Sequence, residues 1–377
     1  MKVVVVGGGI VGLCAAWWLK RNGHTPLILE QGPLPNPAAA SHDHHRLIRL
    51  AHGAGDGRGR MIRQAYAAWD LLWSDLGRAH YVENGMLVVI HGEGDWGHSC
   101  RHGLDEAGHV YEVWERPRLV ERCPFLVLTE SSHALFMARG GAILIEQTLR
   151  SVLAWLIERG VEVHANARVE HIVAPAGSVT LADGRRFFGD SVIVATGAWT
   201  PRLLPALEGV VTPKRNVVLY LEPPEAHRAA WERAPCILDF GGPNDLYGVP
   251  PMRGLPLKIG SGPHRSDGDP DAPRVLREDE PASLLARIAP SLHDAGAYRV
   301  VDHRVCFYAW TDDERFRMGR VADGPVVYAT GCSGQMAKFG AVAGQQLARC
   351  ATGMLTGRAL SEWALGEAHV EDDVAAA

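Results

Sequence analysis

A glycine-rich segment near the N-terminus has the composition of a dinucleotide-binding turn. Gly7-Gly8-Gly9-Ile10-Val11-Gly12 follows four consecutive valines and precedes an apolar helical segment. The glycines allow a tight turn and a close approach to a pyrophosphate, which would lie at the helix N-terminus, where free amides and the helix dipole favour an anion. Glu30 ends the next predicted strand and can accept hydrogen bonds from a ribose diol. The order of these features predicts dinucleotide binding.

A secretory signal peptide is the alternative interpretation of this N-terminus. Met1-Lys2 precede an apolar run, but glycines interrupt the run and Lys20-Arg21 end it. No small-residue cleavage site follows cleanly. We therefore prefer the dinucleotide-binding interpretation.

A histidine- and arginine-rich segment, Ser41-His42-Asp43-His44-His45-Arg46-Leu47-Ile48-Arg49, comes next. Adjacent residues of an extended chain point to opposite sides, so these histidines cannot converge on one ion without a tight turn, and we expect no metal site. Arg46 and Arg49 have the i,i+3 spacing of a helix and could present two cations to one anion. A solvated basic turn is the alternative.

Two later segments also contain groups that could act in chemistry. Leu257-Lys258-Ile259-Gly260 places a lysine within an apolar strand, either as a solvated edge residue or as a buried functional amine. Gly331-Cys332-Ser333-Gly334 connects a predicted strand to a predicted helix. The first amides of that helix lack intrahelical partners and could face a group that becomes anionic.

The elements that must position these residues are strands and helices in alternation. Apolar spacing predicts helices over 60–76 and 143–159, and a hairpin turns at Asp183-Gly184. Buried strands are predicted near residue 3 and over 191–195. Such distant strands imply a dinucleotide domain that is assembled from separate parts of the chain.

Composition limits the class of protein. The chain has 377 residues, a hydrophobic share of 47% and a charged share of 21%, as in two-domain soluble proteins. A net charge of −5 gives no general attraction to nucleic acid or anionic lipid, so a small-molecule partner is expected. No apolar stretch is long enough for a membrane span. Seven scattered cysteines without a C-x-x-C pair indicate a reducing, cytoplasmic location.

Together these segments resemble the monomeric sarcosine oxidase and N-methyltryptophan oxidase branch of the D-amino-acid-oxidase-like (DAO) flavoproteins. The resemblance covers nearly the whole chain and rests on the glycine motif, Ser41 to Arg49, Tyr247, Lys258, Cys306-Phe307-Tyr308 with Asp313-Glu314, and Gly331 to Lys338. It implies an α/β fold, with a discontinuous Rossmann-like FAD-binding domain of glutathione-reductase type and a sheet-based α+β substrate-binding domain. The first would comprise 1–80, 140–215 and 303–370, the second 81–139 and 216–302, and 371–377 a frayed tail.

The resemblance implies that FAD is the cofactor and that a thioether joins Cys306 to its 8α-methyl group. A buried free cysteine is the alternative. The residues expected to bind FAD are Gly7, Gly9, Ile10, Val11, Gly12, Glu30, Gln31, Ser41, Arg46, Val169, Thr196, Gly197, Trp199, Cys306, Gly331, Ser333, Gly334, Gln335 and Lys338.

The same resemblance assigns expected roles in catalysis. Arg46 would lie against the flavin ring, Arg49 with Lys338 would bind the substrate carboxylate, and Lys258 would activate O₂. The residues expected to line the site beside them are His42, Tyr247 and Tyr308. The implied reaction is oxidation of a secondary amino acid to an imine that hydrolyses, with O₂ reduced to H₂O₂.

Other functions stay open at this point. They are a dehydrogenase with another electron acceptor, a primary D-amino acid or glycine oxidase, and a non-catalytic flavin-binding subunit. A monomer or a weak homo-oligomer is expected.

Two departures from the family pattern concern the substrate. Gly260-Ser261-Gly262-Pro263-His264 stands where the family has Gly-Tyr-His, so His264 is in register only with a gap. Asp43-His44-His45 stands where the family has Gly-Asp-Thr. The first departure leaves room for a larger side chain, so we expect an N-alkyl or cyclic amino acid of undetermined size rather than sarcosine itself.

Overall fold

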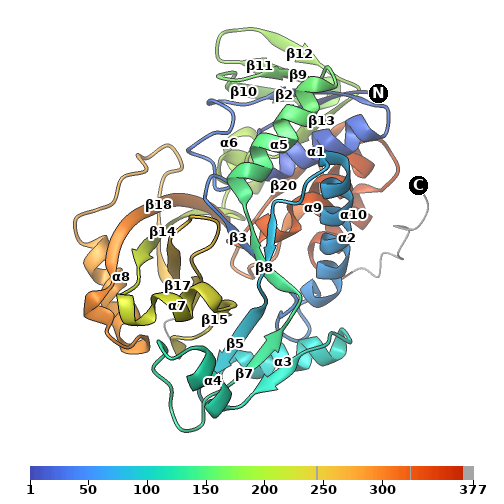
Figure 1. Cartoon of the computed structure of the whole chain (residues 1–377). Coiled ribbons are helices and arrows are strands. Elements are labelled where there is room, and N and C mark those ends of the chain that lie inside the picture. Colours follow the sequence, from blue (N-terminus) through green and yellow to red (C-terminus); the bar gives the residue numbers. More distant parts are fainter. Residues whose placement is uncertain (243–244, 323, 368–377) are drawn as a thin grey trace.

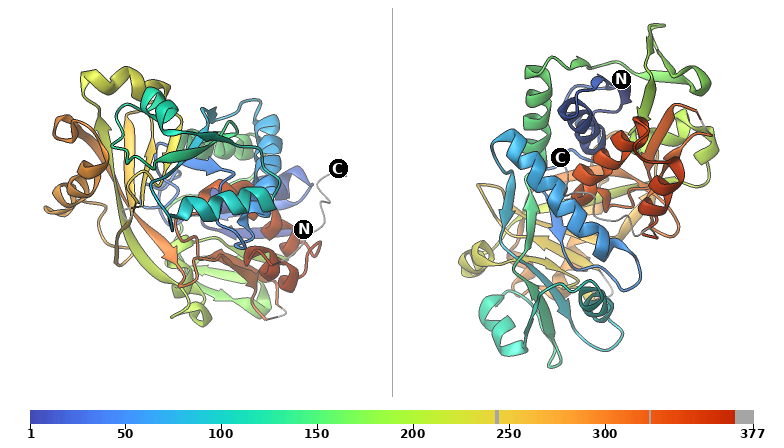
Figure 2. Two further views of the ribbon diagram at one scale, coloured as in Figure 1. Left: turned by 90° about the horizontal axis from the view of Figure 1, so that it is seen from below. Right: turned by 90° about the vertical axis from the view of Figure 1, so that its right-hand side faces the viewer.

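The computed structural model describes residues 1–242, 245–322 and 324–367, apart from the side chains of 263 and 264. The expected frayed tail, 371–377, and the side chain of His264 lie outside these described residues. Within them, the strands form a six-stranded sheet, an eight-stranded sheet and two three-stranded sheets. Figure 1 shows the six-stranded and eight-stranded sheets at opposite ends of the molecule, and Figure 2 shows the same separation from two other sides.

The six-stranded sheet contains the predicted dinucleotide-binding strand. In sheet order its strands are β19 (Arg317–Arg320), β20 (Val326–Thr330), β13 (Ser191–Val194), β1 (Lys2–Val6), β2 (Thr25–Leu29) and β9 (Glu162–His164). Neighbours are parallel except β19 and β20. Val4 pairs with Leu27 on one side and with Val192 on the other. The structure therefore confirms that distant segments assemble one Rossmann-like sheet.

Helices pack on this sheet and form the largest core with it. They are α1 (Ile10–Arg21), α2 (Arg58–Leu76), α5 (Ile145–Glu158), α9 (Gly340–Ala351) and α10 (Gly357–Ala364). A Cβ atom on Gly344 would lie 2.5 Å from the Ala15 backbone nitrogen, so this glycine permits close contact between α9 and α1. The helix predicted over 60–76 is α2, and the one predicted over 143–159 is α5.

The eight-stranded sheet contributes residues to that core and also forms a second, separate core. In sheet order its strands are β18 (Arg299–Trp310), β14 (Thr212–Glu222), β17 (Leu257–Asp267), β16 (Leu246–Val249), β15 (Cys236–Leu238), β5 (Met86–Ile90), β7 (His133–Met137) and β6 (Glu112–Trp114). Only β15 and β5 pair in parallel. The accompanying helices are α3 (Trp96–Glu106), α4 (Arg116–Arg122), α7 (Glu225–Arg233) and α8 (Glu280–Ile288). Strands β14 and β18 each cross a predicted domain boundary, and the domain division stays a prediction.

The remaining strands form two small antiparallel sheets. One is β10 (Val169–Val173), β11 (Ser178–Leu181) and β12 (Arg186–Phe188), and the predicted turn at Asp183-Gly184 joins its last two strands. The other, β3 (Arg46–Arg49), β8 (Gly140–Ile143) and β4 (Tyr81–Glu83), lies between the two large sheets (Figure 1). A further short helix, α6, spans Thr200–Leu203. The helical interpretation of the Arg46 and Arg49 spacing is wrong, because pairing with β8 holds this segment as a strand.

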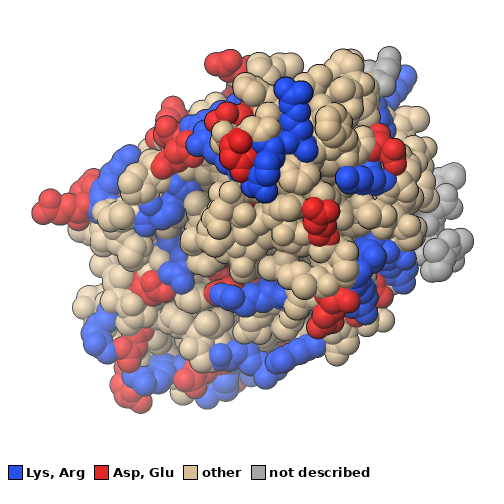
Figure 3. All heavy atoms as spheres, turned by 90° about the horizontal axis from the view of Figure 1, so that it is seen from above, with Lys and Arg blue, Asp and Glu red and all other residues tan. Residues whose placement is uncertain are grey.

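The surface contains charges of both signs. Basic and acidic side chains are interspersed on the face drawn in Figure 3. Among the described residues, no helix is both long and apolar enough to cross a membrane.

Candidate active site

A cavity runs past the glycine motif at the carboxyl ends of β1, β2 and β13. We call it the Gly-motif cavity. Residues expected to bind the cofactor that line it are Gly7, Gly9, Ile10, Val11, Glu30, Gln31, Ser41, Arg46, Val169, Thr196, Gly197, Trp199 and Gly334. Those outside its lining are Gly12, Cys306, Gly331, Ser333, Gln335 and Lys338. Ligands of open α/β sheets bind at this edge.

The glycine motif and Glu30 fit a dinucleotide. Gly7 has a φ of +106°, and a Cβ atom on it would lie 2.5 Å from the Ala195 carbonyl oxygen, so only glycine fits there. A Cβ atom on Gly12 would lie 1.9 Å from the Gly7 oxygen, which explains its packing role. The Glu30 carboxylate accepts hydrogen bonds from the Gly8 amide at 2.7 Å and the Gly32 amide at 3.0 Å. These bonds fix an acceptor on the cavity wall where a ribose diol is expected.

A second cavity, of about 720 Å³, adjoins the first. Its lining includes Arg49 and Lys338, the two residues expected to bind a carboxylate. We call it the Arg49 cavity. Arg46, Tyr308, Gly334 and Ala337 line both cavities. The two cavities therefore adjoin at these residues, and groups bound in them would lie side by side, as transfer between a cofactor and a substrate requires.

Arg49 and Lys338 converge on the same oxygen atom. Arg49 Nη2 donates to Gln335 Oε1 at 3.3 Å, and Lys338 Nζ donates to it at 2.8 Å. The Arg49 guanidinium also lies 5.0 Å from the centre of a Trp96 ring. Burial, reinforced by the neighbouring Arg49, lowers the pKa of Lys338 well below its usual value. A bound anion would oppose that shift.

Lys258 is a buried amine and not an edge residue. Strand β17 lies inside the eight-stranded sheet, and the Lys258 side chain is 2% exposed. Its Nζ donates to Asp43 Oδ2 at 2.5 Å and to the His45 carbonyl oxygen at 3.1 Å. Cross-strand pairing with Tyr220 on β14 fixes its place in the sheet. The alternative of a solvated edge-strand lysine is wrong.

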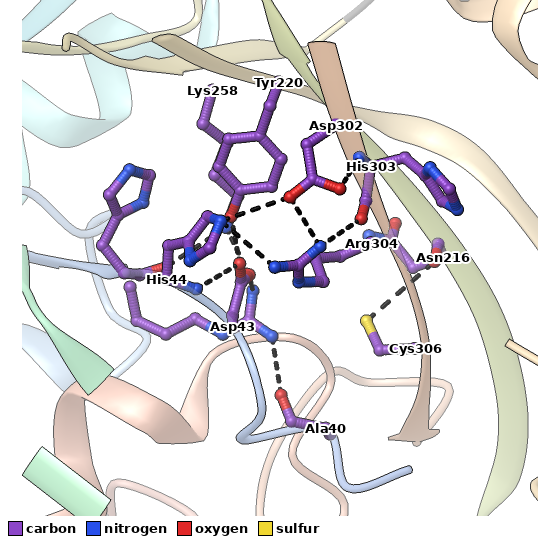
Figure 4. A network of polar contacts seen from close by, with 12 residues as sticks. Ala40, Asp43, His44, Asn216, Tyr220, Lys258, Asp302, His303, Arg304 and Cys306 are labelled. Carbon is purple, nitrogen blue, oxygen red and sulfur yellow. Dashed lines mark hydrogen bonds and ion pairs between the residues drawn. The ribbon is translucent and has the colours of Figure 1, made fainter. Parts of the chain in front are cut away.

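Asp43 is the centre of this polar network (Figure 4). Its carboxylate, which is 0% exposed, accepts hydrogen bonds from Arg46, Lys258 and the Tyr220 hydroxyl. Burial by itself would raise the pKa of Asp43, but the Arg46 and Lys258 cations lower it far below its usual range. Burial lowers the pKa of Lys258 to about 8, and Asp43 opposes this decrease. One anion therefore holds two buried cations in their charged forms.

Replacing this anion should destabilise the fold. We expect Asp43→Asn to lower the free energy of unfolding by about 3–5 kcal/mol at pH 7, because Arg46 and Lys258 would remain buried without a counter-charge. Urea denaturation measures the change. The folded-state pKa of Asp43 is depressed, so the difference should be full above about pH 4 and should shrink at lower pH.

The matched control for this prediction is Asp70→Asn. Asp70 makes a surface ion pair with Arg139, and its side chain is 66% exposed. Such pairs contribute about 0–1 kcal/mol. A loss at Asp43 no larger than the loss at Asp70 would contradict a structural role for the network.

The remaining predicted site residues lie in different places. Tyr247 lines the Arg49 cavity, and Tyr308 lines both cavities. Cys306 is 4% exposed and lines neither cavity, but it lies two residues before Tyr308 on the same strand, so both side chains share one face. Its Sγ contacts the Asn216 carbonyl oxygen at 3.9 Å (Figure 4).

His42 does not line either cavity, although it was expected in the site. It lies in the turn before β3, where its amide donates to the Ala39 carbonyl oxygen at 3.0 Å. His45 is the histidine beside Lys258, and neither of its ring nitrogens has a hydrogen-bond partner among the described residues. Burial, together with Lys258, lowers the pKa of His45 to about 3, so its ring is neutral.

Sequence reasoning gave no role to the acidic residues of the Arg49 cavity, of which Glu314 alone was noted, as part of the family resemblance. Beside its basic residues the described part of the chain places Asp56, Asp95, Asp239, Asp245 and Glu314 in the lining. Asp239 directly follows a short apolar strand, which is a signal that could have identified it. Among the described residues, no three histidine, cysteine or acidic side chains are grouped so as to hold a metal ion.

Comparisons with known proteins identify the family of the chain. The chain matches the family of FAD dependent oxidoreductases (DAO) over residues 2–350. It is 28% identical over 372 residues to monomeric sarcosine oxidase of Bacillus sp. (strain B-0618), covering 94% of this chain and 92% of the relative. It is 26% identical over 355 residues to peroxisomal sarcosine oxidase of Mus musculus, covering 91% of this chain and 90% of the relative.

A solved structure shows the same fold. NikD, an unusual amino acid oxidase essential for nikkomycin biosynthesis, matches with a TM-score of 0.81 and 23% identity, covering 95% of this chain and 96% of that chain. Because the family match spans most of the chain and the fold agrees, this protein belongs to the DAO family of FAD-dependent oxidoreductases and acts on CH–NH bonds.

Proposed function

We propose that the protein is an oxidase of a secondary amino acid, N-alkyl or cyclic, that yields an imine and reduces O₂ to H₂O₂. The observation that carries this proposal is the convergence of Arg49 and Lys338 on Gln335 Oε1. Two cationic donors around one oxygen acceptor are the environment that a substrate carboxylate needs. Carboxylate binding there would orient the substrate beside the residues shared with the Gly-motif cavity.

The charge around the site also favours a neutral amine. A secondary amine in water has a pKa near 10 and is mostly protonated, which leaves no lone pair to release. Arg46 and Lys258 line the same cavity as the basic pair Arg49 and Lys338. Nearby cations disfavour a further cation. The bound amine should therefore be neutral more often than in water.

FAD, when bound, would supply the redox chemistry: it would accept two electrons and one proton from the CH–NH group, whose second proton is released, and the electrons would pass to O₂. The residues that would hold it are those of the Gly-motif cavity, with Arg46 and Tyr308 at the end shared with the Arg49 cavity. We assign the covalent link to Cys306. Its support is the shared strand face with Tyr308 and its electrostatic interaction with Arg46.

The thioether has a direct test. Protein precipitated with acid should stay yellow because its flavin is bonded to the chain, and Cys306→Ala should release all flavin on the same treatment. Absorbance of the pellet and the supernatant measures the effect. Cys332→Ala is the matched control, since Cys332 lines the Gly-motif cavity and is also free. Loss of colour from the unmodified protein would exclude the link.

The class of substrate is tested by anaerobic bleaching of the bound flavin. N-alkyl amino acids, glycated ones included, and cyclic amino acids should bleach it, and primary amino acids should react more slowly. If none of these compounds bleaches the flavin, the proposal is wrong and a non-catalytic flavin-binding subunit is favoured instead.

A dehydrogenase with a different electron acceptor is the second candidate. The observation that favours it is the ion pair between Lys258 and Asp43, because a carboxylate offsets part of the charge expected to activate O₂. Peroxide yield separates the two functions. An oxidase should form one H₂O₂ for each imine, whereas a dehydrogenase should turn over in air only with an added acceptor.

A further inference from the structure

Asp239 is a buried carboxylate on the wall of the Arg49 cavity, and no described residue is its partner. The residue is 7% exposed, and among the described residues its side chain makes no hydrogen bond or ion pair. Burying a carboxylate without a partner is costly, and such groups in native proteins need an explanation. Because Asp239 faces a cavity, a ligand group is the explanation that fits its position.

The surroundings of Asp239 are also acidic. Asp245 and Asp95 line the same cavity. Asp95 is already engaged, because its Oδ2 accepts from the amides of His91 at 2.6 Å and Gly92 at 3.1 Å. Burial, with the charges of Asp245 and Asp95, raises the pKa of Asp239 to about 7. A cation would relieve this repulsion, whereas a neutral polyol would not.

The cavity is large enough for a substrate with a long side chain. Its volume of about 720 Å³, part of which a flavin at the end shared with the Gly-motif cavity would fill, is in the range of pockets that enclose drug-sized ligands. Arg49 and Asp245 are near enough to interact electrostatically. The basic pair Arg49 and Lys338 and the acidic residues Asp239 and Asp245 therefore belong to one site. One ligand can therefore contact both.

We propose that the substrate is a secondary amino acid whose side chain ends in an ammonium or guanidinium group. Its α-carboxylate would bind Arg49 and Lys338, and its terminal cation would bind Asp239 with Asp245. This inference rests on the proposed function, because it uses the same carboxylate site. Asp239 is then a residue that determines substrate specificity.

Binding of compounds that lack an α-amine tests the inference without turnover. Isothermal titration of the flavin-loaded enzyme at pH 8 compares hexanoate, 6-hydroxyhexanoate and 6-aminohexanoate, with 4-aminobutanoate and 8-aminooctanoate as length variants. The best ω-amino acid should bind at least about tenfold more tightly than hexanoate, since one charge pair is formed. In turnover, Nα-methyl-lysine should exceed Nα-methylnorleucine in kcat/KM by a similar factor.

Asp239→Asn should abolish this preference. Asparagine adopts positive φ values readily, so it suits the φ of 56° at this position. Asp70→Asn, which removes the same charge from the surface, should leave the preference unchanged. If Asp239→Asn does not fold, the series of compounds on the unmodified protein still decides the question.

The pH dependence gives an independent readout. Both 6-aminohexanoate and hexanoate carry the carboxylate that would bind Lys338, so the ratio of their affinities cancels the titration of Lys338. This ratio should rise between pH 6 and pH 8, as Asp239 ionises. Asp239→Asn should remove most of this rise. The charged groups that face this region are Asp95, Asp245, Glu314, Arg49 and Arg265. The nearby Cys100 thiol stays neutral because burial raises its pKa.

Three outcomes would overturn the inference. Equal binding of hexanoate and every ω-amino acid would do so and would leave the proposed function intact. Tightest binding of 6-hydroxyhexanoate would favour a polyol side chain instead. Failure of every carboxylate to bind would overturn the carboxylate site of the proposed function, and this inference with it.

Discussion

Lys258→Met is expected to slow oxidation of the reduced flavin by O₂ about 10²–10³-fold and to slow reduction by substrate far less. A fixed cation stabilises the negative charge that develops on O₂, and loss of one preorganised electrostatic group costs about this factor. Lys258 is suited to this role because it is buried and lines the Arg49 cavity, although its ion pair with Asp43 offsets part of its charge. Stopped-flow mixing measures the two half-reactions separately.

The pH profile distinguishes a charge effect from a structural one. Burial lowers the pKa of Lys258 to about 8, so its cation is present below that pH and is lost as the pH rises through it. Reoxidation of the unmodified protein should slow over that range, and the variant should show no such step. Lys214→Met on the neighbouring strand, where Lys214 pairs with Asp267, is the control. Equal slowing of both half-reactions would exclude oxygen activation by Lys258.

Arg49→Met and Lys338→Met should each lower kcat/KM for a carboxylate substrate by about 10–100-fold. A hydrogen bond between charged groups contributes about 1.5–3 kcal/mol, and each variant removes one such donor. The double variant should lose less than the product of the single losses, because both donors act on one group. Steady-state kinetics and titration with a carboxylate that is not oxidised measure these effects.

The same pair makes carboxylate binding depend on pH. Burial and Arg49 lower the pKa of Lys338, so part of its charge is gained on binding, and the affinity should fall as the pH rises. Lys338→Met should flatten this dependence. Arg49→Lys is the conservative control, because it keeps the charge and loses the planar fork. Variants that bind the carboxylate as tightly as the unmodified protein would place the substrate elsewhere.

Local sequence was sufficient for the dinucleotide half of the protein. The four valines, the glycine motif and Glu30 are contiguous or nearly so, and their backbone geometry follows from residue type, as the φ of Gly7 shows. The periodicity of α2 and α5 likewise depends on neighbours along the chain. The roles expected of Lys258, Arg49 and Lys338 were implied by the resemblance to a family.

Only the tertiary structure decided how these groups act together. Strand order placed Lys258 inside a sheet, and the pairing of β17 with β14 brought Tyr220 beside it. Asp43 reaches Lys258 across more than two hundred residues of sequence, and Asp239 lines the cavity of the carboxylate site from the bend that follows β15. The sequence by itself determined the glycine turn and the helices, whose geometry depends on adjacent residues. The ion-pair network around Asp43 and the group of acidic residues in the Arg49 cavity depend on contacts between distant segments, which no local pattern encodes.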